Sequence, residues 1–219
     1  MRKTTAIAAA LTATAALTLS ACGEGKSKDE PFAVSTSARH HPAATVLDTP
    51  FNKPELTLTD THGKKYDLAK ETKGHPTLVY FGYTNCPDVC PLAMSNIALA
   101  YKKLSPSQQE KLRVVFLTSD PERDTPKRLG AWLRGAGDPD FVGLSGDFKA
   151  TQAAARSVGV GIQAPEKDEH GKIVSTHGKS VLAFSPKDDK AHVIYGEEAT
   201  ADDYAKDLPK LLKGEIPSP

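Results

Sequence analysis

TLVYFGYTNCPDVCP, residues 77–91, joins a continuous apolar run to two cysteines. The first eight residues are rich in β-branched and aromatic side chains, as in a strand that is buried on both faces. Residues 92–104 follow with apolar side chains near helical spacing. We therefore expect a buried strand that leads through a short cysteine-bearing loop into a helix, which is the repeating unit of an α/β sheet.

The rest of the chain alternates between strand-like and helix-like segments in the same way. Further strands are predicted over residues 112–120, 180–186 and 192–196, and further helices over residues 126–137, 146–160 and 199–214. The segment 55–68 alternates polar and apolar residues around a THGK turn and predicts a hairpin. Asp124 or Thr125 is the expected cap of the helix that begins near Pro126.

This order of elements is that of thioredoxin-like proteins. We predict an α/β fold for residues 46–215, with a thioredoxin-like central sheet flanked by helices and an N-terminal hairpin extension. A content of 39% hydrophobic and 25% charged residues suits one globular domain of this size. Because 28 basic residues are balanced by 27 acidic ones, no nucleic-acid partner is expected.

Residues 1–21 have the pattern of a secretory signal peptide. A positively charged start precedes an apolar stretch, residues 6–19, that is too short to span a bilayer comfortably. LSAC (residues 19–22) resembles a lipobox, at which cleavage leaves Cys22 diacylated at the new N-terminus. Cleavage after Ala21 without lipidation is the alternative. Since two acyl chains hold stably, we expect the protein at the outer face of a bacterial plasma membrane, lipid-anchored at Cys22.

Residues 22–45 are rich in Gly, Ser, Lys, Ala and Pro and predict a flexible tether. His40 and His41 lie in this segment, and we interpret them as part of a solvated tether rather than as a metal site. If Cys22 carries lipid, Cys86 and Cys90 are the remaining cysteines of a protein in an oxidising compartment. The two are therefore expected to act together.

The prolines that follow Cys86 and Cys90 bear on where the two sulfurs lie. A residue before proline is disfavoured in the α region, and proline is favoured at the first helical position. We therefore expect both cysteines in a loop outside the helix, with Pro91 as the first helical residue. The unpaired N–H groups and the dipole of a helix N-terminus favour thiolate, so a lowered pKa is expected for the pair.

Three interpretations of the cysteine pair remain open. A structural disulfide would close a very short loop and would stabilise the protein little. A thioredoxin-type redox couple usually has two intervening residues, whereas three separate Cys86 from Cys90. Two soft thiolates that converge without being forced into a disulfide suit copper(I), or zinc, with an imidazole as the third ligand.

His177 is the expected third ligand, because it lies just before the predicted strand 180–186, in a loop that faces the cysteine loop in a thioredoxin-like fold. The other histidines fall in the tether, in turns or at strand ends away from that edge. Asp120 stands at the carboxyl edge of the predicted strand 112–120, where parallel sheets place their sites. We expect Asp120 to accept a hydrogen bond beside the site or to be a weak oxygen ligand of copper(II). A turn-forming Asp–Pro is the alternative.

Taken in order, YTNCPDVCP (83–91), SDPERDTP (119–126) and THG (176–178) resemble the Sco/SenC family of thioredoxin-like copper proteins. The resemblance covers roughly residues 46–213. It implies an acid at Asp120 near a copper site, and as copper ligands it implies Cys86, Cys90 and His177.

The residues beside the histidine depart from the family pattern. Many members carry an acid and a hydroxyl residue there, whereas this chain has Thr176 and Gly178. The polar surroundings of the imidazole are therefore expected to differ from the family's usual arrangement.

The resemblance also implies a function. It points to a membrane-anchored extracytoplasmic copper metallochaperone for maturation of the dinuclear copper centre of cytochrome c oxidase subunit II. Its cargo would be Cu(I) or Cu(II), and its partner that subunit or another copper-requiring exported protein. The alternative is a thiol-disulfide reductase, with the redox pair Cys86 and Cys90, that keeps the cysteines of that copper site reduced. A peroxide-reducing relative of the peroxiredoxins is disfavoured, because CPxxCP is not a typical peroxidatic arrangement.

Overall fold

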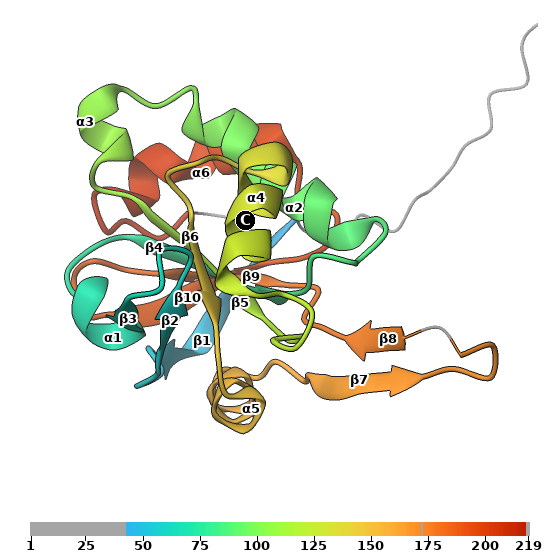
Figure 1. Ribbon diagram of the computed structural model, residues 1–219. Coiled ribbons are helices and arrows are strands. Elements are labelled where there is room, and N and C mark those ends of the chain that lie inside the picture. Colours follow the sequence, from blue (N-terminus) through green and yellow to red (C-terminus); the bar gives the residue numbers. More distant parts are fainter. Residues whose placement is uncertain (1–42, 172, 218–219) are drawn as a thin grey trace, which may run out of the picture. The chain divides into compact units, whose positions relative to one another are not determined.

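The computed structural model describes residues 43–171 and 173–217 (Figure 1). The predicted signal peptide, Cys22 and the predicted tether up to residue 42, with His40 and His41, lie outside the described residues. Within the described ranges, no helix combines the length and the apolar character that crossing a membrane requires.

An eight-stranded sheet forms the centre of the domain, in the order β1–β10–β9–β4–β5–β6–β2–β3 (Figure 1). β4, β5 and β6 run parallel, and the other neighbours pair antiparallel. The strands of this sheet are β1 (Ala44–Asn52), β2 (Thr57–Asp60), β3 (Lys65–Asp67), β4 (Thr77–Gly82), β5 (Arg113–Thr118), β6 (Val142–Ser145), β9 (Val181–Phe184) and β10 (Lys190–Tyr195).

Helices cover both faces of this sheet (Figure 1). One face carries α2 (Val89–Tyr101), α4 (Pro126–Ala136) and α6 (Ala201–Leu211), and the other carries α5 (Phe148–Ser157). The short helices are α1 (Leu68–Glu71) and α3 (Pro106–Gln109). All six residues of β4 are buried, and alternate side chains enter the two apolar layers, Tyr80 on the α2 side and Phe81 on the α5 side. The predicted α/β fold with a flanked central sheet is confirmed.

The predicted hairpin is formed by β2 and β3, with Leu58 opposite Tyr66. β2 also pairs antiparallel with β6, so the hairpin extends the central sheet at one edge. This arrangement confirms the N-terminal hairpin extension and shows which strand it joins.

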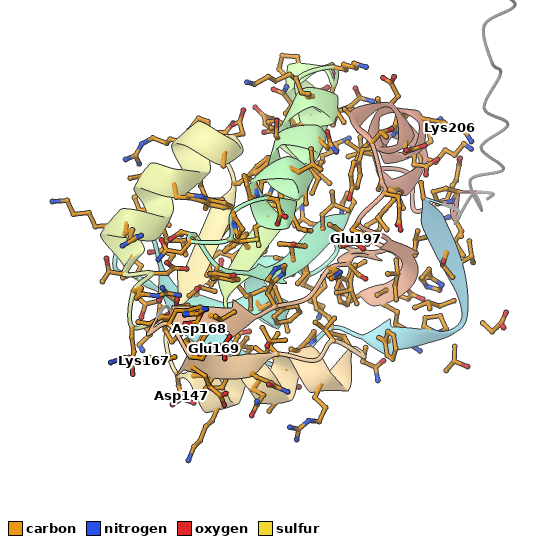
Figure 2. All side chains as sticks on the ribbon, turned by 90° about the vertical axis from the view of Figure 1, so that its right-hand side faces the viewer. Asp147, Lys167, Asp168, Glu169, Glu197 and Lys206 are labelled. Atoms are coloured by element: carbon orange, nitrogen blue, oxygen red, sulfur yellow. The ribbon has the colours of Figure 1, made fainter. Side chains whose placement is uncertain are left out.

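A second hairpin, β7 (Gln163–Lys167) and β8 (Ile173–Thr176), forms a sheet of its own and projects beside the main sheet (Figure 1). Figure 2 views the domain from the side of this hairpin and labels Lys167, Asp168 and Glu169 at its turn. The sequence pattern did not predict these strands, because all but one of their residues are at least partly exposed and no apolar face alternates along them.

β1 and β6 were also missed by the sequence pattern. β1 is an edge strand without a fully buried residue, and it begins at Ala44, within the last residues of the predicted tether. β6 has four residues and includes Gly143, at which a Cβ would lie 2.7 Å from Cδ1 of Leu133 in α4. A short strand with a glycine gives little periodicity, although the glycine is what allows α4 to pack closely.

The start of α2 corrects the sequence analysis, and the start of α4 decides between its two candidate caps. α2 begins at Val89 with Asp88 as its N-cap, so Cys90 lies inside the helix and Pro91 is its third residue, contrary to prediction. Proline is tolerated there because the first-turn N–H groups have no intrahelical partner. In α4 the cap is Thr125, whose side chain accepts a hydrogen bond from the backbone N–H of Arg128, and Asp124 has a different role.

Candidate metal centre

The candidate metal centre lies where two segments meet at one edge of the sheet. The β4–α2 connection carries Cys86, and Cys90 follows in the first turn of α2, while His177 lies between β8 and β9. β4 and β9 are antiparallel neighbours, with Tyr80 opposite Val181, so the end of one strand adjoins the start of the other. The pairing of these two strands therefore assembles a site from residues that are far apart in the sequence.

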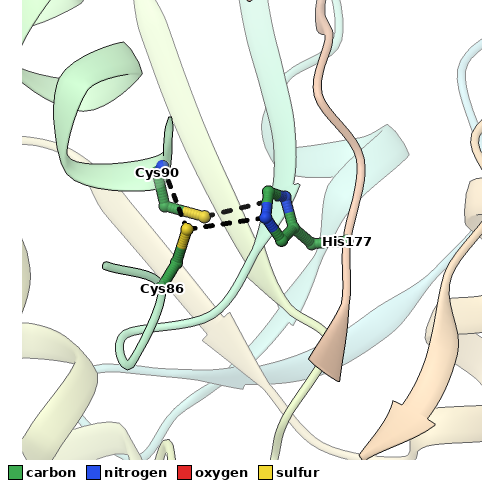
Figure 3. Close-up of side chains that lie close together, drawn as sticks. All are labelled: Cys86, Cys90 and His177. Carbon is green, nitrogen blue, oxygen red and sulfur yellow. Dashed lines mark hydrogen bonds between the residues drawn. The ribbon is translucent and has the colours of Figure 1, made fainter. Parts of the chain in front are cut away.

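The three side chains point toward one another (Figure 3). Sγ of Cys86 lies 3.5 Å from Nε2 of His177, and Sγ of Cys90 lies 3.8 Å from its Nδ1. One ligand atom from each residue lies within 4.8 Å of the other two, and no other such group of three His, Cys, Asp or Glu occurs among the described residues. Cys86 and Cys90 are free thiols. The structure thus brings together the three residues that the sequence analysis singled out as metal ligands.

Cys90 is the inner sulfur of the site. Its side chain is fully buried, and its Sγ accepts a hydrogen bond of 3.6 Å from the hydroxyl of Tyr80. Gly82, the last residue of β4, makes room for it, because a Cβ there would lie only 2.8 Å from Sγ of Cys90. Sequence reasoning missed Gly82, although a glycine within a bulky buried strand is the usual signal of a close approach.

The two thiols differ in acidity. The pKa of Cys86 is lowered to about 5, chiefly because the Cys90 thiol donates a hydrogen bond to its sulfur; the backbone N–H of Cys90, at 3.4 Å, and the nearby His177 act in the same direction. The pKa of Cys90 is raised, because its proton is held by Cys86 and because burial disfavours a charge. The predicted lowering of the pKa is therefore right for Cys86 and wrong for Cys90.

The hydrogen bonds of His177 identify the nitrogen that is free to bind a metal. Nδ1 lies 2.6 Å from the carbonyl oxygen of Gly178, which can only accept, so Nδ1 carries the proton. Nε2 then presents its lone pair toward Sγ of Cys86. Metal-ligating histidines commonly donate their other N–H to a carbonyl in this way. The ring also packs against Tyr83, with the ring centroids 5.3 Å apart.

Gly178, which departs from the family pattern, is closely packed. A Cβ at this position would lie 2.7 Å from Cγ1 of Val160. A larger residue would therefore push the backbone beside His177 away from the turn that follows α5. In this chain the backbone carbonyl of Gly178 orients the imidazole.

Asp120 lies at the carboxyl end of β5, as predicted, but outside the group of three donor residues. Its side chain is 1% exposed, forms an ion pair with Arg123 and accepts a hydrogen bond of 3.4 Å from Ser175. The carboxylate is thus engaged with a guanidinium and a hydroxyl. Its predicted role as a weak oxygen ligand or direct acceptor stays a prediction.

Asp124 is a second residue that sequence reasoning missed. Its carboxylate is buried and accepts hydrogen bonds from the backbone N–H of Thr84 (2.8 Å), from Oγ1 of Thr84 (2.5 Å) and from Oγ1 of Thr118 (2.7 Å). Thr84 lies two residues before Cys86. The signal that could have identified Asp124 is the second acid in SDPERDTP, which follows a strand end where a helix cap was already available in Thr125.

This donor set fits a soft or borderline metal ion. One thiolate, a second thiol that loses its proton on binding and one imidazole match the preferences of Cu(I) and Zn(II). Cys86 is 6% exposed and His177 is partly exposed. Among the three donors, the imidazole of His177 is therefore the most exposed.

Comparisons with known proteins agree on one family. A family model described as SCO1/SenC matches residues 45–213, nearly the same range as the resemblance seen in the sequence. Protein SCO1 homolog 2, mitochondrial, of Arabidopsis thaliana is 33% identical over 166 residues, which are 76% of this chain and 59% of that protein. The chain thus spans less than two thirds of that relative's length.

Two solved structures are similar along most of their length. ScoI of Bradyrhizobium japonicum with copper bound is 32% identical, with a TM-score of 0.61 over 75% of this chain and 98% of that chain. Apo Sco1 of Thermus thermophilus is 30% identical, with a TM-score of 0.67 over 78% of this chain and 96% of that chain. These neighbours have the thioredoxin-like fold that the sequence predicts.

Proposed function

The chain belongs to the SCO1/SenC family, and on this premise we propose that it is a copper metallochaperone for the dinuclear copper centre of cytochrome c oxidase subunit II. The observation that carries the proposal is the convergence of Cys86, Cys90 and His177 within 4.8 Å. The similar ScoI structure of Bradyrhizobium japonicum has copper bound, which supports copper rather than zinc as the cargo.

In this proposal the two sulfurs and the imidazole have different roles in binding copper. Cys86 and Cys90 hold Cu(I) as thiolates, and Nε2 of His177 supplies a third donor that also suits Cu(II). Cys86 is already a thiolate at neutral pH, whereas Cys90 gives up its proton when the ion binds. Thiolates of the target replace these ligands one by one, so the ion moves without a change in its oxidation state.

The proposal includes the location of the protein. Residues 1–21 direct export, Cys22 carries the lipid, and the tether of residues 22–45 links the anchor to the domain. In this proposal the copper site lies at the outer face of a bacterial plasma membrane, within reach of an exported, copper-requiring partner. The low charge surplus of the chain is in keeping with a protein partner rather than a nucleic acid.

Replacement of His177 by Ala, with both cysteines intact, tests the site. We expect Cu(II) affinity to fall and oxidase activity in cells to drop, because one of three donors is removed. Cys86→Ser is the matched variant, and it should abolish the sulfur-to-Cu(II) charge-transfer band in an optical titration. If Cu(II) binding and oxidase assembly survive His177→Ala unchanged, the site as drawn is wrong. Retention of zinc in place of copper by the purified protein would contradict the choice of cargo.

A second candidate function is a thiol-disulfide reductase for the cysteines of the target. The unequal thiols favour it, because the Cys86 thiolate can attack a target disulfide and Cys90 can resolve the mixed disulfide. The dithiol of this protein would then become a disulfide, and two electrons and two protons would reduce the target's disulfide to two thiols. Cys90→Ser should trap the mixed disulfide at Cys86. If disulfide exchange is lost in a variant that still loads copper into the oxidase, the reductase role is not required.

A further inference from the structure

One segment, from the last residue of β5 to the first turn of α4, contacts both halves of the candidate site but supplies no metal donor. We call residues Thr118–Arg128 the clamp segment; it contains the SDPERDTP sequence. None of its acids belongs to the three-residue group of metal donors found in the described part of the chain. Its side chains reach the loop that carries Cys86 and, separately, the strand that leads to His177.

On the cysteine side, the clamp segment fixes the two residues that precede Cys86. Asp124 accepts two hydrogen bonds from Thr84, and Arg128 donates one to Oδ1 of Asn85. The Asp124 carboxylate is completely buried, so its two charge-assisted bonds with Thr84 are held away from water, whereas the Arg128–Asn85 bond is exposed. The entry to the cysteine loop is therefore tied to the start of α4.

On the histidine side, the clamp segment contacts the β7–β8 hairpin at Ser175. Of the nine residues in β7 and β8, Ser175 alone is buried. Its hydroxyl donates to Asp120 at 3.4 Å and accepts from Arg123 at 3.3 Å. His177 follows only two residues later, so Ser175 fixes the end of β8, the arm of the hairpin that leads to the imidazole.

Apolar packing does little to hold this arm. The hairpin shares no strand pairing with the central sheet, and Ile173 and Val174 are exposed. A cavity of about 190 Å³ lies between the hairpin and the clamp segment, with Asp120, Arg123 and Ile173 among its lining residues. Among the described residues of β7 and β8, Ser175 is the buried one, and its polar contacts with Asp120 and Arg123 link this part of the hairpin to the body of the domain.

We infer that Asp120 and Arg123 are positioning residues that hold His177 against the cysteine pair through Ser175. The inference rests on the proposed function, because it assigns these residues a role toward the same metal donors. The Asp120–Arg123 ion pair stays satisfied when Ser175 moves away, so the arm can release the imidazole without leaving a buried charge unpaired. Asp120 thus acts on the site through the hairpin rather than as a ligand.

Ser175→Ala tests this inference in the full-length protein. Loss of two weak hydrogen bonds is expected to lower Cu(II) affinity about threefold to tenfold. Cu(I) affinity should change less than about twofold, because the thiolates are untouched. In the metal-free protein, the NMR contact between the rings of Tyr83 and His177 should weaken. Ser185→Ala, which removes a similarly buried hydroxyl at the opposite edge of the sheet, is the matched control and should leave all three readouts unchanged.

His177→Ala, measured in parallel, separates this inference from the proposed function. If His177→Ala does not weaken Cu(II) binding, the proposed site fails. If His177→Ala weakens it while Ser175→Ala behaves like Ser185→Ala, the positioning role is overturned and the site stands. Arg123→Lys provides a second variant at a partly exposed side chain, and it should shift Cu(II) affinity and the ring contact in the same direction as Ser175→Ala.

Discussion

Replacement of Gly82 by Ala perturbs the candidate site from the sheet side. Gly82 ends β4, and its backbone does not require glycine, since its φ is not in the left-handed region. The added methyl group would lie 2.8 Å from Sγ of Cys90, 2.8 Å from Cε1 of Tyr80 and 3.0 Å from Cε2 of Phe116. The substitution is therefore a test of packing at the inner sulfur and not of backbone strain.

The expected magnitude follows from these distances. Comfortable contacts between such heavy atoms lie at about 3.5–4.0 Å, so the methyl group overlaps its neighbours by roughly 0.7–1.2 Å. Overpacking of this kind costs about 1–3 kcal/mol, and the reduced entropy of the unfolded chain offsets up to about 1 kcal/mol. A net loss of about 1–2 kcal/mol corresponds to a fall in Tm of roughly 2–8 °C for a domain of this size.

Thermal unfolding of the metal-free protein measures this loss, and a Cu(I) competition titration measures the site. We expect severalfold weaker Cu(I) binding, because the Cys90 sulfur is displaced. Gly135→Ala is the matched control, since Gly135 is exposed in α4 and a Cβ there meets nothing within 4 Å. It should raise stability by about 0.5–1 kcal/mol through helix propensity and leave copper binding unchanged.

A double mutant locates the clash. In a Cys90→Ala background the sulfur is gone, so Gly82→Ala should cost about 1 kcal/mol less than in the parent protein. An equal cost in both backgrounds would refute the contact with the sulfur. Unchanged Tm and unchanged copper affinity in the single variant would refute the packing argument altogether.

Three further predictions concern the thiols, the clamp segment and the lipid. Alkylation of the metal-free protein should reach half its maximal rate near pH 5, because the pKa of Cys86 is about 5 and the thiolate is lost only as the pH falls through that value. Cys90→Ala removes the thiol that donates to the Cys86 sulfur and should move the midpoint upward. A low midpoint that persists in Cys86→Ser would contradict the assignment. Asp124→Asn should destabilise the protein by about 1–3 kcal/mol in urea unfolding and make the backbone amide of Thr84 exchange faster with solvent, because its hydrogen bonds to the carboxylate are weakened. An unchanged exchange rate at Thr84 would argue against the role of the clamp segment. Cys22→Ala should shift the protein from the membrane fraction to the soluble extracytoplasmic fraction, and continued membrane association would count against lipid anchoring.

The central elements of the fold could be predicted because their side chains are buried. β4 and β5 lie between two helical layers, so each reads as a continuous apolar run, and α4, α5 and α6 carry clear caps. β1 and the β7–β8 hairpin could not be predicted in this way, because residues that face solvent leave no apolar period. β1 becomes a strand by pairing with β10, and β7 and β8 become strands by pairing with each other, so backbone pairing rather than propensity decides these segments.

The candidate site was predictable where chemistry is local and less so where it depends on tertiary contacts. Cys86 and Cys90 are marked by their spacing, and His177 by its place before a core strand. Their unequal acidity was not predictable, because it arises from the hydrogen bond between the two thiols and from the burial of the Cys90 sulfur. The hydrogen bond between Ser175 and Asp120 was equally unpredictable, because Ser175 lies 55 residues away on a strand without a sequence signal.

The separation of the three metal ligands along the chain determines how strongly bound copper stabilises the folded protein. Cys86 and Cys90 are four residues apart and can bind Cu(I) in an unfolded chain, whereas His177, 87 residues beyond Cys90, joins them only when β4 and β9 pair. A ligand stabilises the native state only by its preference for that state over the unfolded one. Cu(I) should therefore raise Tm much less than its affinity suggests, and Cu(II), which depends more on the imidazole, should report the folding of the sheet more faithfully.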